Sequence, residues 1–139
     1  MTDRTFTPDE ANKALGEVQP LAEQLTRVRE RMRELESAQS KLVIAIGGNG
    51  VGRAAGDLEA TQSELAGLIA TASACIRGLN QLGVLVKDAD LGLLDFPALR
   101  DGVPVLLCWH VGEAAVEYWH GYEEGFAGRK PIDRGEQWL

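Results

Sequence analysis

The chain has 139 residues, of which 45% are hydrophobic, and this is enough for one domain with a real core and excludes intrinsic disorder. Its net charge is −7, and its one basic cluster (residues 27–33) is interleaved with glutamates. No apolar run is long enough to span a bilayer, and two cysteines are too few for a disulfide framework or a zinc ribbon. We therefore expect a soluble, cytoplasmic protein that binds neither nucleic acid nor membranes.

The first predicted helix begins beside Thr7. Thr7 is the expected N-cap, Pro8 suits the first helical position, and Glu10 completes a capping box. This short helix should end near Val18, because Pro20 lacks an amide hydrogen and disfavours helical geometry in the residue before it. Either the helix kinks at Pro20 or a new helix starts there.

Two long helices follow, over residues 20–46 and 57–82. In both, apolar residues recur at alternating spacings of three and four, as in Leu25, Val28, Met32 and Leu35 or in Leu65, Leu68, Ala72 and Cys75. The glycine-rich segment 47–52 between them supports a reversal of the chain. These features predict an antiparallel, coiled-coil-like helical hairpin. Because one hairpin cannot bury both of its long faces, we also expect a homodimer through the hairpin.

After Gly83 the pattern becomes that of strands. Residues 84–86 and 91–99 have strand composition, Asp101-Gly102 is typical of a tight turn, and residues 103–111 form the clearest strand. We predict an antiparallel β-meander of three or four strands over about residues 84–139, after a helical part over about residues 7–82. The fold class is α+β in a single domain.

The segment that follows decides where His120 points. If residues 112–113 form a two-residue turn, Val105 opposes His120, and the imidazole enters an apolar layer. If residues 113–124 are instead helical, Glu117 and His120 match the Glu-x-x-His spacing of di-iron bundle sites. The strand is favoured because the preceding strand needs a partner, but the register stays open.

His120 is the centre of the predicted site. Imidazole and carboxylate ligands suit zinc, iron or manganese, and Glu113 with Asp95 or Asp88 would complete the set. The alternative is a core histidine whose ring nitrogens meet a carboxylate or a backbone carbonyl. No Ser/His/Asp or Cys/His set is visible in the sequence, so no catalytic residue is assigned.

Distinctive motifs fill the stretch between residues 91 and 132. It reads LGLLDFPALRDG, then LCWHVGE, YWH and GFAGRKPI, and the chain opens with Phe6-Thr7 and Glu10-Ala11-Asn12. In this combination the chain resembles the bacterial family catalogued as domain of unknown function 2203. The resemblance covers nearly the whole chain and implies a small stand-alone protein without an established activity. The family often has an arginine at position 110, which favours a site centred on His120, Glu113, Asp95 and Arg129.

We therefore expect a polar pocket where the meander meets the helices, holding a metal ion or a small anionic ligand. The metal ligands would be Asp95, Glu113 and His120, and the ligand contacts would come from Arg129, Arg100 and Trp119. The rival hypothesis is a non-catalytic coiled-coil module, in which the hairpin recruits a partner and the polar residues only stabilise the sheet.

Overall fold

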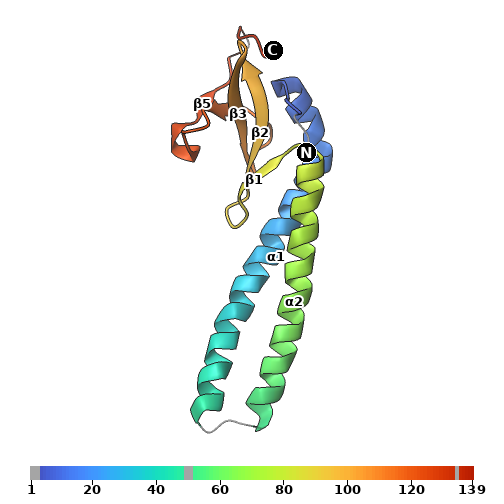
Figure 1. The fold of residues 1–139 in the computed structure, drawn as a ribbon, viewed down its shortest axis with the longest axis vertical. Helices are drawn as coiled ribbons and strands as arrows, with labels where there is room; N and C mark the ends of the chain where they lie inside the picture. Colours follow the sequence, from blue (N-terminus) through green and yellow to red (C-terminus); the bar gives the residue numbers. More distant parts are fainter. Residues whose placement is uncertain (1–3, 49–51, 134) are drawn as a thin grey trace.

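The computed structural model describes residues 4–48, 52–133 and 135–139 and shows the predicted α+β class (Figure 1). Two long helices form a hairpin, and a five-stranded antiparallel sheet lies at the end of the hairpin that also holds both chain termini. The elements are α1 Pro8–Gly48, α2 Gly52–Gln81, β1 Leu85–Asp88, β2 Leu93–Arg100, β3 Val103–His110, β4 Tyr118–His120, the 3-10 helix η1 Phe126–Gly128 and β5 Lys130–Pro131.

α1 is one continuous helix of 41 residues, so the predicted end of a short helix near Val18 and the start of a new one at Pro20 are wrong. Pro20 lies on the exposed side of α1, where water can reach the carbonyl of Gly16 that has lost its helical donor. The buried stripe continues on both sides of the proline, and this packing outweighs its local cost. The capping box is confirmed, since the Glu10 amide donates to Thr7 Oγ1 at 3.1 Å and the Thr7 amide donates to Glu10 Oε1 at 2.9 Å.

The core of the hairpin occupies only the half that lies near the sheet. Buried side chains fall between residues 11 and 35 of α1 and between residues 72 and 79 of α2. Towards the tip, residues 36–48 and 52–71 include none that is fully buried. The predicted glycine-rich reversal falls partly on residues 49–51, which lie outside the described part of the chain.

Asp90 fastens the sheet to the hairpin. It lies between β1 and β2, and its carboxylate meets Arg29 at 2.8 Å and Arg33 at 3.0 Å, both on α1. A third arginine of the basic cluster, Arg31, pairs with Glu64 of α2 at 2.9 Å. Part of the basic cluster therefore makes ion pairs between elements.

The sheet is a simple meander in the order β1-β2-β3-β4-β5. The Asp101-Gly102 turn between β2 and β3 is confirmed, with φ of 53° and 80°. Pro97 lies in β2 beyond the end of β1, so it faces no strand on that side, and its carbonyl accepts a hydrogen bond from the Phe6 amide at 2.7 Å. The short β5 was not predicted.

β3 and β4 pair one residue away from the predicted register. His120 lies opposite Leu106 instead of Val105, and Tyr118 lies opposite Cys108. The connection between the strands spans residues 111–117 instead of two residues, and the helical alternative is wrong because this segment leads into a strand. Since side chains alternate along a strand, a shift of one residue moves His120 to the opposite face of the sheet.

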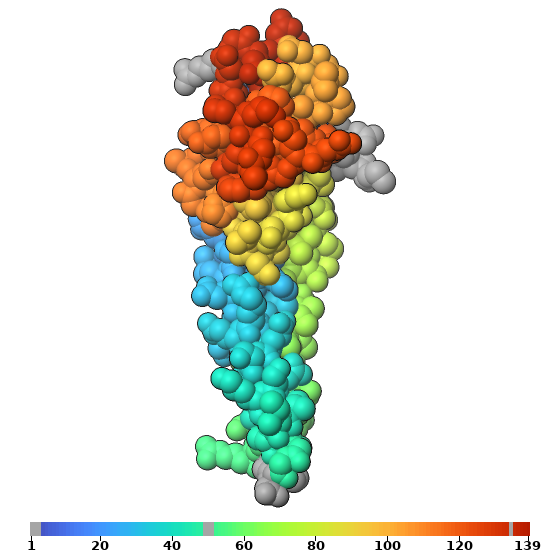
Figure 2. Space-filling model, turned by 90° about the vertical axis from the view of Figure 1, so that its left-hand side faces the viewer, coloured from blue at the N-terminus to red at the C-terminus, as the bar shows by residue number. Residues whose placement is uncertain are grey.

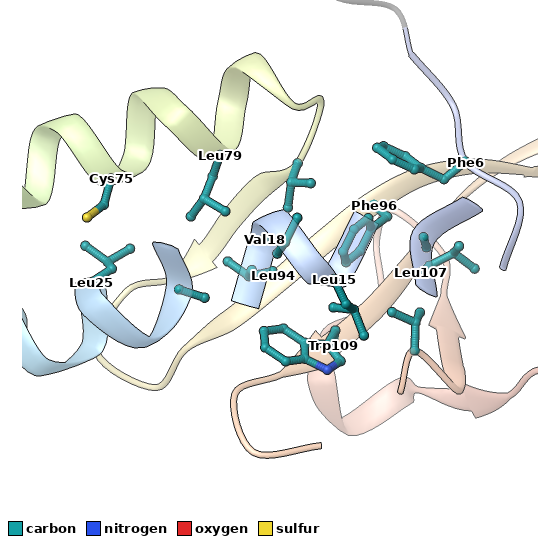
Figure 3. Packing of buried hydrophobic residues seen from close by; sticks show 14 of the residues in the cluster. Phe6, Leu15, Val18, Leu25, Cys75, Leu79, Leu94, Phe96, Leu107 and Trp109 are labelled. Carbon is teal, nitrogen blue, oxygen red and sulfur yellow. The ribbon is translucent and has the colours of Figure 1, made fainter. Parts of the chain in front are cut away.

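The two faces of the sheet therefore differ in character. The face we call inner packs on the helices, and its core residues join those of α1 and α2 in one cluster (Figure 3). That cluster includes Leu94, Phe96, Leu107 and Trp109 from the sheet, with Leu15, Val18 and Leu79 from the helices. The face we call outer carries the alternate residues of the same strands, and it is turned away from the helices.

Candidate metal centre

Three polar side chains meet on the outer face, one from each of three neighbouring strands. Asp95 of β2 lies directly opposite Cys108 of β3, and His120 of β4 lies diagonally beside Cys108. The three residues are 3%, 2% and 1% exposed. One ligand atom from each lies within 4.8 Å of the other two. We call these residues the outer-face cluster.

Both ring nitrogens of His120 have partners. Nδ1 lies 2.8 Å from the carbonyl oxygen of Gly121, and because a carbonyl only accepts, Nδ1 carries a proton. Nε2 lies 3.1 Å from Asp95 Oδ1. This contact needs one proton, which either the imidazole or the carboxyl supplies. The Gly121 carbonyl thus fixes the ring so that Nε2 points into the cluster.

Burial controls the protonation of the cluster. It raises the pKa of the Asp95 carboxyl, although the nearby His120 and Lys87 oppose this shift. It also raises the pKa of the Cys108 thiol to about 11, against a smaller opposing effect of the Arg129 charge. At neutral pH Cys108 is therefore a thiol. Since nucleophilic catalysis needs a thiolate and a free base, the cluster does not resemble a Cys/His enzyme site.

Glu113 lies outside the cluster and is bound by Arg129. The guanidinium donates to both carboxylate oxygens at 2.9 Å, and the backbone amide of His110 donates to Glu113 Oε1 at 2.7 Å. Burial alone would raise the pKa of Glu113, but these hydrogen bonds and the Arg129 charge together lower it. A carboxylate held in this way is poorly placed to ligate a metal. Both terminal nitrogens of the guanidinium are occupied, and only the buried Nε has no hydrogen-bond partner among the described residues.

Arg129 is also enclosed by aromatic rings. It stacks at 3.9 Å over Tyr118 and at 4.5 Å over Phe126, and its Nη2 donates to the Cys108 carbonyl at 3.3 Å. The predicted site residues Glu113 and Arg129 therefore lie together beside the cluster, where they fasten the C-terminal part of the chain to the sheet.

Arg100 and Trp119 lie at a separate place. Arg100 stacks at 4.5 Å on the Trp119 ring, and Lys130 lies 4.7 Å from the same ring. They line a surface pocket of about 750 Å³. Arg100 is paired with Glu136, and Lys130 is paired with Glu124 at 2.8 Å. Because both cations already have carboxylate partners, the pocket has little free positive charge for an anion.

The structure thus unites two of the three predicted metal ligands, Asp95 and His120, and adds Cys108. Sequence reasoning did not assign this cysteine to the site. The missed signal is its strand position: in the observed register Cys108 lies opposite Asp95, and both share the outer face with His120. The cluster also lies on the far side of the sheet from the helices, and the expected location between meander and helices is corrected accordingly.

The helical hairpin, the meander and the buried Asp/Cys/His cluster define an α+β protein with a candidate metal centre. No helix within the described residues has both the length and the apolar character needed to cross a membrane. The family model described as "Uncharacterized conserved protein (DUF2203)" matches residues 4–132, and the chain belongs to this family. No curated protein and no solved structure compared with the chain matches it. The family description states no activity, so a function must be argued from the cluster.

Proposed function

We propose that this protein binds a divalent transition metal ion, preferably zinc, through Asp95, Cys108 and His120. The observation that carries the proposal is the convergence of three buried donor groups within 4.8 Å of one another. Ligands bound to one tetrahedral zinc ion are about 3.3–3.8 Å apart, given bond lengths of about 2.0–2.3 Å. Side-chain movements of about 1 Å would therefore complete the site.

Charge and donor type both support a divalent ion. A bound metal ion displaces the protons of the Asp95 carboxyl and the Cys108 thiol, which then carry two negative charges. His120 binds as a neutral imidazole, so a dication makes the buried site neutral. Sulfur and nitrogen donors favour zinc over magnesium or calcium. A small anion alone fits less well, because the cluster already contains a buried carboxyl and the adjacent Arg129 is bound by Glu113.

The surroundings of the cluster also resemble those of a metal site. A metal-binding histidine usually donates its second ring N–H to a carbonyl or a carboxylate, as His120 does to the Gly121 carbonyl. Three protein ligands leave the fourth position of a tetrahedral metal ion open for water or for a small anion. One site could therefore hold both the metal ion and the anionic ligand that the sequence suggested. A free thiol persists in a reducing compartment, which agrees with the expected cytoplasmic location.

Elemental analysis of the purified protein tests the proposal. We expect about one zinc ion per chain after dialysis against zinc, and at least a tenfold weaker affinity in His120→Ala and Cys108→Ala. His110→Ala is the matched control, because it removes the other histidine and should keep the metal. A wild-type protein that binds no transition metal, or an equal loss in all three variants, would refute the site.

The distal half of the hairpin supports a second proposal, a homodimer. Val43 and Ile69 are 53% and 48% exposed, and no residue in this half is fully buried among those described. The two helical segments of this half, residues 36–48 and 52–71, are about 20–30 Å long and together about 20 Å wide. One face of this pair therefore offers a contact area of about 500 Å² per chain. A second copy would bury about 1,000 Å² in total, near the lower limit for a specific interface. This assembly requires no other partner.

Light scattering with size-exclusion chromatography decides the dimer proposal. We expect a dimer for the wild type and a monomer for Val43→Glu combined with Ile69→Glu, with unchanged helical content. Substituting the exposed Glu30 by Gln is the control on the same hairpin. A wild-type monomer across the micromolar range would refute the dimer and leave the metal proposal intact.

A further inference from the structure

The chain between β4 and β5 lies across the outer face of the sheet. The Phe126 ring is 5.9 Å from the His110 ring, and Arg129 covers Tyr118 and bonds to the Cys108 carbonyl. His110, Tyr118 and Cys108 all belong to the outer face, so residues 122–129 run over it, whereas Gly121 stays bound to His120. Figure 2 views the molecule from this side, where orange and red chain forms the surface at the level of the sheet. We call residues 122–129 the cover segment.

Glu124 holds the cover segment in its folded shape. Its Oε1 accepts from the Gly121 amide at 2.9 Å, and its two oxygens lie 2.8 and 2.9 Å from Lys130 Nζ. A Cβ on Gly121 would lie 3.1 Å from Glu124 Oε1, and a Cβ on Gly128 would lie 3.0 Å from Glu124 Cβ. Glycine at both positions therefore leaves the space into which Glu124 folds.

Arg129 is the second fastening, through its two hydrogen bonds to Glu113. The two strands that flank the cover segment are the two shortest of the sheet, with three residues in β4 and two in β5. Segments with few backbone hydrogen bonds and exposed contacts open more readily than a packed core. The inner face, by contrast, is held by the helices.

We propose that the cover segment swings away from the sheet to admit a metal ion to the outer-face cluster, and that Glu124 and Arg129 hold it closed. The three ligand residues are at most 3% exposed, so an ion reaches them only if part of the chain moves. Residues 122–127 of this segment are all exposed, whereas the strands and helices around the cluster contribute buried core residues. As a route for metal, this inference rests on the proposed function.

Thiol labelling tests the opening without any metal. Cys108 lies under the cover segment and Cys75 lies in the hairpin core, so peptide-resolved labelling with iodoacetamide reports on both movements in one sample. We expect Glu124→Ala to raise the labelling rate of Cys108 about fivefold and leave that of Cys75 unchanged, because one hydrogen-bonded ion pair is lost. Glu123→Ala removes the same charge from the same segment and should change neither rate. An unchanged Cys108 rate, or an equal rise for both cysteines, would overturn the inference.

Uptake of Co²⁺ by the metal-free protein tests the route. Thiolate-bound Co²⁺ gives a charge-transfer absorption, so stopped-flow traces follow its arrival at Cys108. If opening limits entry, the rate levels off at high Co²⁺, and Glu124→Ala raises this limiting rate by the same factor as the labelling. Rates that stay proportional to Co²⁺ and equal in wild type, Glu124→Ala and Glu123→Ala would refute the gate and leave metal binding intact. If the wild type takes up no Co²⁺, the proposed function fails, and labelling alone decides whether the cover opens.

Discussion

Asp95 and His120 come from strands that are not neighbours, yet Asp95 Oδ1 lies 3.1 Å from His120 Nε2. β3 runs between β2 and β4, so the two backbones are about 9–10 Å apart. Both side chains therefore reach across β3 and meet beside Cys108. The pair supplies two ligands of the proposed metal centre. Because both side chains are buried, each also needs the other as its hydrogen-bond partner in the metal-free protein.

Breaking the Asp95–His120 pair should destabilise the metal-free protein. His120→Leu leaves the Asp95 carboxyl buried without its partner, and we expect a loss of about 2–4 kcal/mol in urea unfolding with a chelator present. Asp95→Leu combined with His120→Leu should cost less than the sum of the single substitutions, because neither side chain of the pair is left buried without the other. Strict additivity of the two effects would show that the pair is not coupled.

The Glu113–Arg129 pair should give a pH-dependent stability. The pKa of Glu113 is lowered in the folded protein, so the ionised carboxylate stabilises the fold above the ordinary value of 4.5. This contribution is lost as the pH falls through the lowered folded-state pKa. We expect Glu113→Gln to cost about 1–3 kcal/mol at pH 7, and the gap to wild type to narrow below about pH 4. A gap that stays constant from pH 7 to pH 3 would contradict this origin.

Gly92 should tolerate no side chain. Its φ is +72°, and a Cβ there would lie 2.7 Å from Val111 Cγ2 and 2.9 Å from Thr26 Cγ2 of α1. We expect Gly92→Ala to lower stability by about 2–4 kcal/mol, since it combines backbone strain with a clash. Gly102→Ala is the matched control, because its φ is +80° but nothing lies within 4 Å of the added Cβ. Equal losses of thermal stability in the two variants would mean that strain alone matters.

Replacing Pro20 should stabilise α1. The residue is exposed inside a continuous helix, where proline removes one hydrogen bond that alanine would restore. We expect Pro20→Ala to raise the free energy of unfolding by about 1–3 kcal/mol, measured by thermal and urea unfolding. A destabilised variant would contradict this account of Pro20.

Much of the fold could be predicted because its signals are local. The Thr7–Glu10 capping box, the spaced apolar residues of the two long helices and the Asp101-Gly102 turn each depend on residues close in sequence. The break at Pro20 was predicted for the same kind of reason and was wrong, because burial along the whole stripe of α1 outweighs one missing hydrogen bond.

The candidate site could be predicted only in part. His120 and Asp95 were chosen for their chemistry and do meet, whereas Glu113 was chosen in the same way and lies with Arg129. Proximity between strands depends on register, and the turn at Val111-Gly112 does not specify it, because five further residues precede β4. A long connection permits several registers, and packing of the inner face against the helices selects one of them.

Apolar spacing and turn residues act over a few positions, and these local patterns are enough to specify the hairpin, the meander and the residue types available for a site. The meeting of Cys108 with Asp95 and His120, on the face away from the helices, instead depends on how the strands pack in three dimensions. Side chains alternate along a strand, so a shift of one residue exchanges the faces, and the burial of large inner-face side chains such as Trp109 selects the register.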